Sequence, residues 1–500
     1  MPASIRSTMN LSASATLTAE PPTPATSIHD GYRSPLETRN ASKAMRAIWS
    51  EQRRFGLWRR VWLAAAESQR EVGIEIPDEA IEAMRSTLDE IDFESAARHE
   101  ARIRHDVMAH VHAFGEAAPA ARGVIHLGLT SQDVVCNAEV LQWREALDLT
   151  CLKAAIVIDR LGRFAARYRD LPTTGFTHFQ PAQPVTVGKR ACLWAQDFAI
   201  ALSELEACRR DLRLKGLRGA TGTQASYLAL LGGDPARVEA LERTFAERLG
   251  FTPEACWAVC GQTMPRLADA RMLSALALAA AAIHKWATDV RLLAGFGELA
   301  EPIEPDQVGS SAMAYKRNPM RCERACGLAR FVMGLPATAL QTAATQWLER
   351  SLDDSSVRRL MIPEAFLALD GALDLAANVA DGLEAIESAI AARLEQELPF
   401  LATETLLMAA VSRGADRQEA HEVIRQHSRD VQAAMREGGP CDLLERLAKE
   451  PMFDGLLGSI DAVDFAGRSA EQVDRFLAEI VDPIRSRYAG RLGDRPHLRV

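Results

Sequence analysis

The chain has 500 residues, of which 48% are hydrophobic and 25% are charged, and its formal net charge is -9. This balance excludes a disordered chain, and the acidic excess argues against a general nucleic-acid surface, which needs a broad field of Lys and Arg. The length exceeds what one hydrophobic core usually serves, and the abundance of Ala and Leu favours helices. We therefore expect an all-α protein of several domains.

The N-terminal part changes character near residue 30. The first thirty residues are rich in Ser, Thr, Ala and Pro. They hold no apolar run long enough for a signal peptide, so we expect residues 1–30 to form a disordered tail. Short helical patterns follow, with acidic residues at the helix starts. These patterns predict an N-terminal helical domain over residues 31–130.

Long uninterrupted helical patterns begin after Gly128 and cover residues 134–170, 186–215, 266–294 and 320–390. The last of them should break near its two prolines, at 336 and 363. A helix of ~30 residues is about 45 Å long, and several such rods can bury their apolar faces only against each other. We therefore predict a central helical bundle over residues 131–385. The shorter patterns beyond it predict a C-terminal helical domain over residues 386–500.

The most apolar segment and the pattern of cysteines together indicate where in the cell the protein is located. Residues 272–283 form the most apolar stretch, but they are shorter than the ~18 to 20 residues of a membrane span, so we predict a buried bundle helix. The nine cysteines are an odd number, are scattered, and have no His cluster beside them that would complete a metal site. We expect a reducing, cytoplasmic location and no structural zinc.

Irregular segments between the rods contain most of the glycines and prolines, and functional residues are expected on such loops. His178 lies in one of them, THFQPAQP. The polar side chains of Thr177, Gln180 and Gln183 can fix the tautomer of its imidazole, which suits proton transfer. A structural role for His178 is equally open.

The segment RHDVMAHVHAF contains three histidines. On a helix His105 and His112 share a face while His110 points elsewhere, so the three would not converge on a metal. Arg104 and His105 can instead present cations to an anion. Ordinary helix-surface charges are the alternative.

The segment WLERSLDDSSVRR has two adjacent aspartates but lacks the third carboxylate of a diphosphate-metal helix. Its arginines and Ser355 offer guanidinium forks and a hydroxyl, which suit phosphate or carboxylate recognition. A solvated run of charges is again the alternative.

Residues 309–321, GSSAMAYKRNPMR, gather Lys316, Arg317 and Arg321 around an Asn-Pro step. The glycine and the two serines form a flexible segment whose amides can turn towards an anion, and Lys316 adds a point charge. The sequence has no GxSxG elbow, Walker-type GK[ST] or GxGxxG before a strand, so acyl transfer and nucleotide hydrolysis lose support.

Taken together, GSSAMAYKRNP, GFTHFQPAQ, HLGLTSQDV and RHDVMAHVH resemble the fumarase/aspartase superfamily, over nearly all of residues 31–485. The serine loop of that superfamily has the form GSSxMPxKxNP, and here Ala314 stands at the usual proline. Four other segments, KRACLWAQD, GATGTQASY, WLERSLDDS and ELPFLATE, resemble the adenylosuccinate lyase family. The resemblance implies a three-domain all-α fold, no cofactor, and a homotetramer whose active sites are shared between subunits.

The resemblance also implies an activity, the β-elimination of fumarate from adenylosuccinate, giving AMP, and from succinylaminoimidazole carboxamide ribotide (SAICAR), giving AICAR, in purine nucleotide biosynthesis. By matching positions, Ser310 is the base, His178 is the acid that protonates the leaving nitrogen, and Lys316 has an electrostatic role. Asn40 stands where the family usually has Tyr. The other matching positions are candidates for substrate binding: Arg39, Arg104, His105, Asp106, Thr130, Ser131, Gln262, Ser311, Asn318, Arg324, Arg350, Ser355 and Arg359.

Three alternatives stay open at this point. The serine loop is shared across the superfamily, so a sister lyase acting on argininosuccinate, fumarate or a carboxymuconate lactone is one. A non-catalytic helical scaffold that retains the fold is the second. A metal-dependent all-α synthase is the third.

Overall fold

The computed structural model describes residues 27, 29–456, 465–493 and 498. The predicted tail over residues 1–30 therefore lies outside the described residues, apart from positions 27, 29 and 30.

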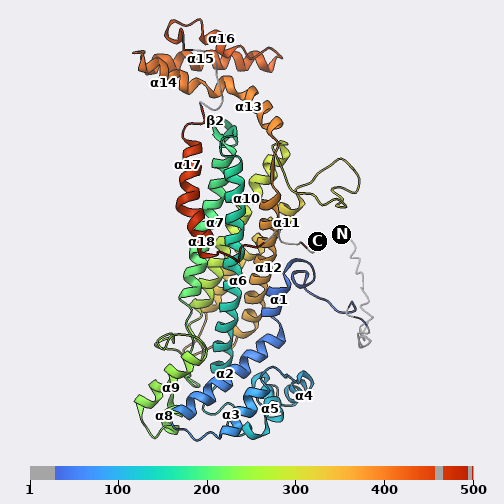
Figure 1. Cartoon of the computed structure of the whole chain (residues 1–500), viewed down its shortest axis with the longest axis vertical. Helices are drawn as coiled ribbons and strands as arrows, with labels where there is room; N and C mark the ends of the chain where they lie inside the picture. Colours follow the sequence, from blue (N-terminus) through green and yellow to red (C-terminus); the bar gives the residue numbers. More distant parts are fainter. Residues whose placement is uncertain (1–26, 28, 457–464, 494–497, 499–500) are drawn as a thin grey trace, which may run out of the picture.

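Five long helices form the centre of the molecule, and Figure 1 shows them as rods that run side by side. Within this bundle α10 packs against α7, α11 and α12, and α6 packs against α7 and α12. With 37 residues, α6 is about 55 Å long. The predicted all-α fold with a long central bundle is confirmed. The five helices are α6 (Ser131–Arg167), α7 (Val187–Arg210), α10 (Leu267–Gly295), α11 (Met320–Ala344) and α12 (Asp354–Gly382).

Helix α10 is the one helix among the described residues that is long and apolar enough to cross a membrane. It is a core helix of the bundle: Ala279, Ala280, Ile283 and Trp286 have no exposed surface. Small alanine side chains let the neighbouring rods approach closely, and the apolar face is buried against them. The prediction of a buried bundle helix for residues 272–283 is confirmed.

The predicted break of the fourth rod at its prolines is wrong. Pro336 lies inside α11 and Pro363 inside α12, while the helix ends at Ala344 and resumes at Asp354. A proline removes one backbone hydrogen bond, and here the apolar faces packed on α10 outweigh that loss. The chain breaks where it must reverse direction, because α11 and α12 pack against each other.

The N-terminal helices start beside the bundle, where Figure 1 labels α1, and continue through α2 to α3, α4 and α5 at its lower end, where α8 and α9 also lie. Hydroxyl caps start two of them, since Ser42 accepts from the amide of Met45 and Ser50 accepts from the amide of Arg53. These elements are η1 (Leu36–Asn40), α1 (Lys43–Ile48), α2 (Glu51–Glu71), α3 (Asp78–Ser86), α4 (Phe93–Ile103), α5 (Asp106–Ala117), α8 (Ala225–Leu230) and α9 (Pro235–Arg248).

A second, smaller hydrophobic cluster lies at the upper end, where Figure 1 shows α13 to α16 above the rods. Leu407, Val431, Leu443 and Phe453 are among its buried residues. The helices here are α13 (Glu387–Leu401), α14 (Thr403–Ser412), α15 (Arg417–Arg436) and α16 (Leu443–Leu447). The predicted domain limits at 130 and 385 stay predictions.

The last described helices return to the bundle. The helices α17 (Ser469–Phe476) and α18 (Asp482–Arg487) pack along α7 and α6, and Val473, Val481 and Ile484 belong to the main core. Arg485 binds Asp159 on α6, at 2.8 Å between Nε and Oδ1. A Cβ on Gly162 of α6 would lie only 2.8 Å from Cγ1 of Val481, so these helices fit tightly.

The segment between α6 and α7 is a β-hairpin, although the sequence suggests only a loop. The strands β1 (Pro172–Thr177) and β2 (Gln180–Thr186) pair in antiparallel fashion, and Thr177 pairs with Gln180. Two residues, His178 and Phe179, therefore form the turn. The hairpin stands at the upper end of the bundle, near the label β2 in Figure 1.

Candidate functional site

His178 occupies a strained turn. Both turn residues have positive φ, 52° at His178 and 59° at Phe179, which is the pattern of a type I′ hairpin turn. Asn and Gly suit such turns, whereas a bulky Phe in this region is an outlier that must be held by its surroundings. The imidazole is exposed at the tip of the hairpin, and no hydrogen bond joins it to another described residue.

Three aromatic rings hold this turn. Phe179 stacks on Phe296 with ring centroids 5.7 Å apart and an interplanar angle of 21°, and Phe176 lies 5.7 Å from the same ring. The guanidinium of Arg393, on α13, lies 4.1 Å from the centre of Phe296. The rings therefore connect the hairpin to the end of α10 and to the upper helices.

The serine loop runs from the end of α10 to α11, and two backbone amides point at its first serine. Ser310 Oγ accepts from the amide of Met313 at 3.1 Å and from that of Ala312 at 3.4 Å. Asn318 donates from Nδ2 to the carbonyl of Gly309 at 3.0 Å, which closes the loop on itself. Ser311 and Lys316 are exposed.

The basic cluster of this loop is smaller than the sequence suggests. Arg321 is buried and donates to Asn378 at 2.7 Å and to Gln307 at 2.9 Å, so it fastens the base of the loop. Arg324, one turn further along α11, is close enough to Arg39 for their charges to interact. Burial, and secondarily the charge of Arg39, lowers the pKa of Arg324. Arg39 and Arg324 thus form a pair of cations beside the loop.

A second group of candidates lies at the lower end of the bundle, where α5 meets the start of α6. Nδ1 of His105 accepts from the amide of Met108, so neutral His105 carries its proton on Nε2, which lies 3.4 Å from Ser131 Oγ. Asp106 binds Arg359 at 2.6 Å. Burial raises the pKa of Asp106, but the hydrogen bond and charge of Arg359 outweigh it, so this carboxyl stays below its ordinary pKa. Arg104 is exposed and ends α4 with φ 56°.

A buried ion pair positions Thr130 and Ser131. Thr130 and Asp133 form a reciprocal capping box at the start of α6. The carboxylate of Asp133 also binds the ammonium of Lys215 and accepts from the amides of Arg218 and Gly219. Because Asp133 and Lys215 have no exposed surface, removing either would leave a buried unpaired charge.

The turn between α11 and α12 holds the third set of lower-end candidates. Arg350 donates to Gln262 at 3.0 Å and pairs with buried Asp354 at 3.1 Å, and Arg266 pairs with the same carboxylate at 2.5 Å. Gly261 must be glycine here, since a Cβ would lie 2.4 Å from the carbonyl oxygen of Glu349. Ser355 lies in the first turn of α12, beside this cluster.

The candidates therefore fall into two places in one chain. Ser131 begins α6, whereas His178 follows its end, so about 55 Å of helix separates them. The upper place contains the hairpin and the serine loop with Arg39 and Arg324. The lower place contains Arg104, His105, Asp106, Thr130, Ser131, Gln262, Arg350, Ser355 and Arg359.

The three histidines of the α4–α5 region have different structural contacts. His105 caps α5, His110 stacks on Phe55 at 3.8 Å, and His112 stacks on His99 at 5.0 Å. Among the described residues no group of three His, Cys, Asp or Glu side chains has the arrangement to hold a metal.

Some positioning residues escape the sequence analysis. The pair Asp133 and Lys215 is one case, and the pattern Thr130-x-x-Asp133 is the signal that could reveal half of it. The ring pair Phe179 and Phe296 is another. It leaves no local signal, because the two rings are more than a hundred residues apart in sequence.

Comparison with known proteins identifies the family. Residues 36–334 match the Lyase family and residues 399–476 match the family described as Adenylosuccinate lyase C-terminus. The chain is 47% identical over 462 residues to adenylosuccinate lyase of Saccharomyces cerevisiae, which covers 91% of this chain and 95% of the relative. It is 44% identical over 459 residues to adenylosuccinate lyase of Schistosoma mansoni, which covers 90% and 95%.

Solved structures share the fold at lower identity. The 3-carboxy-cis,cis-muconate lactonizing enzyme from Pseudomonas putida superposes with a TM-score of 0.77 at 26% identity, over 90% of this chain and 99% of that one. A fumarate lyase from Mesorhizobium sp. BNC1 gives 0.76 at 26% identity, over 88% and 98%. This chain belongs to the adenylosuccinate lyase family of the fumarase/aspartase superfamily, and it is a lyase.

Proposed function

We propose that this protein splits adenylosuccinate into AMP and fumarate, and SAICAR into AICAR and fumarate. Both reactions take a proton from the carbon beside a carboxylate and break the bond between the neighbouring carbon and nitrogen. They need a base, an acid on the other side of the breaking bond, and cations around the charge that develops on the carboxylate. No cofactor enters the proposed reaction.

The observation that carries the proposal is the environment of Ser310. A serine hydroxyl is a poor base unless its alkoxide is stabilised, and the amides of Met313 and Ala312 already donate to Ser310 Oγ. Donors aimed at the charged form favour that form. Ser310 therefore acts as the base, and the ammonium of Lys316, which is close in sequence, strengthens the positive field around it. Ser311, through its amide or hydroxyl, and Asn318 help to hold substrate.

His178 is the proposed acid. The hairpin presents its imidazole at an exposed tip, with a ring stack that fixes the backbone beneath it. The cations Arg39, Arg104, Arg324, Arg350 and Arg359 suit the phosphate and the two carboxylates of the substrate. His105, Asp106, Thr130, Ser131, Gln262 and Ser355 supply hydrogen-bonding groups beside them.

The proposal includes a homotetramer with shared active sites. Its support is the length of α6, about 55 Å, which lies between Ser131 and His178, since a substrate of nucleotide size cannot span it. Side-by-side bundles of different subunits would bring upper and lower ends together. A reducing, cytoplasmic location is part of the same proposal, and all nine cysteines are free.

The test is fumarate release from adenylosuccinate by the purified protein, followed by absorbance. We expect turnover of wild-type protein, and a loss of about two to four orders of magnitude in kcat for His178→Ala and Ser310→Ala. His421→Ala, at an exposed position on α15, is the control that should retain full activity. Release of fumarate from argininosuccinate but not from adenylosuccinate would instead identify a sister lyase.

A further inference from the structure

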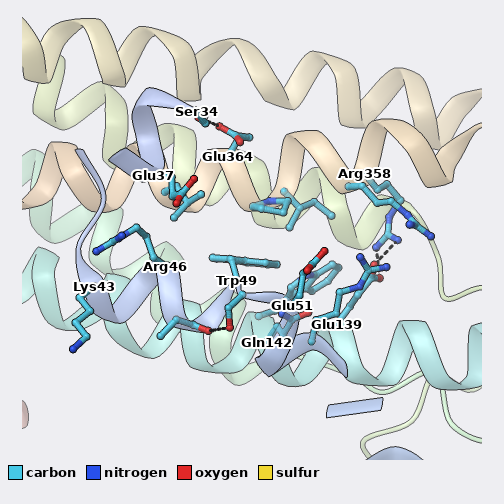
Figure 2. Close-up of a pocket in the computed structure, with 18 of the residues that line it drawn as sticks. Ser34, Glu37, Lys43, Arg46, Trp49, Glu51, Glu139, Gln142, Arg358 and Glu364 are labelled. Atoms are coloured by element: carbon cyan, nitrogen blue, oxygen red, sulfur yellow. Dashed lines mark hydrogen bonds and ion pairs between the residues drawn. The ribbon is translucent and has the colours of Figure 1, made fainter. Parts of the chain in front are cut away.

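The segment that carries Arg39 is held on one face of α12. The π-helical turn η1 packs against α12, and Leu36 at its start is buried. Just before this turn the hydroxyl of Ser34 donates to Glu364 of α12 at 3.3 Å, and Figure 2 shows these two side chains joined. Arg39 itself is exposed, so its position depends on how η1 is seated on α12.

The backbone of η1 touches α12 at a position where α12 has no side chain. A Cβ on Gly371 would lie 2.8 Å from the carbonyl oxygen of Asn40 and 3.0 Å from its carbonyl carbon. The obstacle is backbone, which cannot rotate away as a flexible side chain could. Asn40 is also fixed by its own side chain, because Nδ2 donates to the carbonyl of Pro35 at 3.0 Å. Gly371 therefore sets how closely the residue after Arg39 approaches α12.

Next to this glycine, a buried carboxylate holds the chain that follows η1. Asp370 has no exposed surface, and its Oδ2 accepts from the amide of Ser42 at 2.7 Å. The ammonium of Lys153, on α6, lies 2.5 Å from Oδ1 of Asp370 and 2.7 Å from Oδ1 of Asp374. Buried charges are costly unless they are paired, so Lys153 helps to keep the carboxylate in place for this amide. A hydrogen bond to a charged acceptor is also stronger than one between neutral groups.

We propose that Gly371 and Asp370 are positioning residues for Arg39. They seat η1 on α12 so that this arginine lies beside Arg324, where the two cations bind the phosphate of the substrate. The contacts with α12 lie on both sides of Arg39 in the sequence, so a shift of η1 would move its guanidinium away from the other cation. Two neighbouring guanidinium groups suit a phosphate that carries two charges. This inference rests on the proposed function, because it concerns the same substrate.

The test combines the kinetics of fumarate release from adenylosuccinate with calorimetric titration of AMP into the full-length protein. Gly371→Ala should stay folded, because alanine favours the helical conformation of α12. We expect it to raise both KM and the Kd of AMP at least about tenfold, since a misplaced Arg39 loses a charge-assisted hydrogen bond. The value of kcat should change little, because the phosphate is remote from the breaking bond.

Two further variants complete the comparison. Gly334→Ala is the matched control: Gly334 also lies inside a bundle helix, and nothing lies within 4 Å of its added Cβ, so KM and AMP binding should stay at wild-type values. Asp370→Asn keeps an acceptor for the amide of Ser42 but loses the charge. This variant should fold, since Lys153 retains Asp374 as its partner, and it should weaken AMP binding by a smaller factor than Gly371→Ala.

A double-mutant cycle with Arg39→Ala separates positioning from general damage to the fold. If Gly371 acts through Arg39, Gly371→Ala should change KM and AMP binding by less than about twofold once Arg39 is already alanine. The same factor of loss with and without Arg39 would overturn the inference, and so would wild-type KM and AMP binding in Gly371→Ala. Should that variant fail to fold, the cycle between Asp370→Asn and Arg39→Ala decides in the same way. A wild-type protein that neither binds AMP nor releases fumarate would instead contradict the proposed function, and this inference with it.

Discussion

At the residue scale, Gly309 shows how closely the serine loop folds on itself. A Cβ at this position would lie 2.5 Å from the carbonyl oxygen of Lys316, a distance that real Cβ contacts do not reach. The obstacle is backbone rather than a flexible side chain. The loop can therefore keep its shape around Ser310 only while position 309 has no side chain.

We expect Gly309→Ala to lower kcat by at least about tenfold, because the loop must open and the two amides that donate to Ser310 must move. Thermal unfolding should change little, since the loop is largely exposed. Gly123→Ala is the control: nothing lies within 4 Å of its added Cβ, so activity should be unchanged. Equal kcat values for Gly309→Ala and wild type would contradict this role.

The buried imidazole of His110 leads to a second prediction, which concerns how the free energy of unfolding depends on pH. Burial, and secondarily the charge of Arg59, lowers the pKa of His110 to about 4 in the folded protein, below its ordinary value of about 6.5. The unfolded chain therefore binds the extra proton first as pH falls from about 6.5 to 4, and folding stability decreases across that window. Above it, His110 is neutral in both states and contributes no pH dependence.

We expect His110→Phe to remove this loss, since a phenyl ring can stack on Phe55 but cannot take up a proton. Between pH 7 and pH 4.5 the free energy of unfolding should fall by about 2 kcal/mol less than in wild type. Urea denaturation at both pH values measures it, and comparison with His421→Phe cancels the contributions of other groups. Parallel pH profiles for all three proteins would show that His110 does not titrate in this way.

At the scale of the element, the β1–β2 hairpin places the proposed acid by backbone strain. A two-residue turn of His and Phe with positive φ at both positions has no favourable local propensity. The stack of Phe179 on Phe296 supplies the stabilisation that the turn residues do not. The position of His178 thus depends on a ring that takes no part in the chemistry.

We expect Phe179→Asn to separate stability from activity. Asn tolerates positive φ, so the turn can form and the melting temperature should stay close to that of wild type. Without the ring stack the imidazole is less fixed, and kcat should fall about tenfold or more while KM changes little. Phe179→Tyr, which keeps the stack, should restore most of the activity. A low kcat in the Tyr variant as well would point to a different role for this ring.

The rods of the bundle can be predicted from the sequence, whereas the hairpin and the break between α11 and α12 cannot. The rods of the bundle follow from apolar periodicity, so α6, α7 and α10 begin and end within a few residues of the predicted limits, apart from the early end of α7. The hairpin is missed because its strands contain three prolines and its turn has unsuitable residues. The break between α11 and α12 is misplaced because long-range packing on α10 overrides the local effect of proline.

The candidate site divides in a similar way. Residue types and spacing single out His178 and the serine loop as chemically suitable segments, and the family resemblance gives them roles. Periodicity cannot reveal that Arg321 turns inward to Asn378, since that contact joins residues 57 positions apart.

At the scale of the whole molecule, the separation of the two places predicts complementation between inactive variants. The variant His178→Ala lacks the proposed acid at the upper end of the bundle. The variant His105→Ala lacks a proposed substrate-binding residue at the lower end. If each site takes these residues from different subunits, some sites in a mixed oligomer contain both intact residues. Random mixing of equal amounts should restore about a quarter of wild-type activity, by the chance that both contributing chains are intact at the relevant position.

The measurement is fumarate release after the two variants are unfolded together and refolded. Each variant refolded alone is the control and should stay inactive. No gain on mixing, with the oligomer confirmed by light scattering, would show that one chain supplies both residues.

The return of α17 and α18 to the bundle has a consequence for synthesis on the ribosome. Asp474 pairs with Arg169 at 2.6 Å across about three hundred residues of chain, and Val481 fits against Gly162. The faces of α6 and α7 that these helices cover therefore stay exposed to solvent until almost the entire chain has been made. Premature termination before Ser469 would leave that apolar strip permanently open, so such a product should aggregate or be degraded even though every proposed site residue is present.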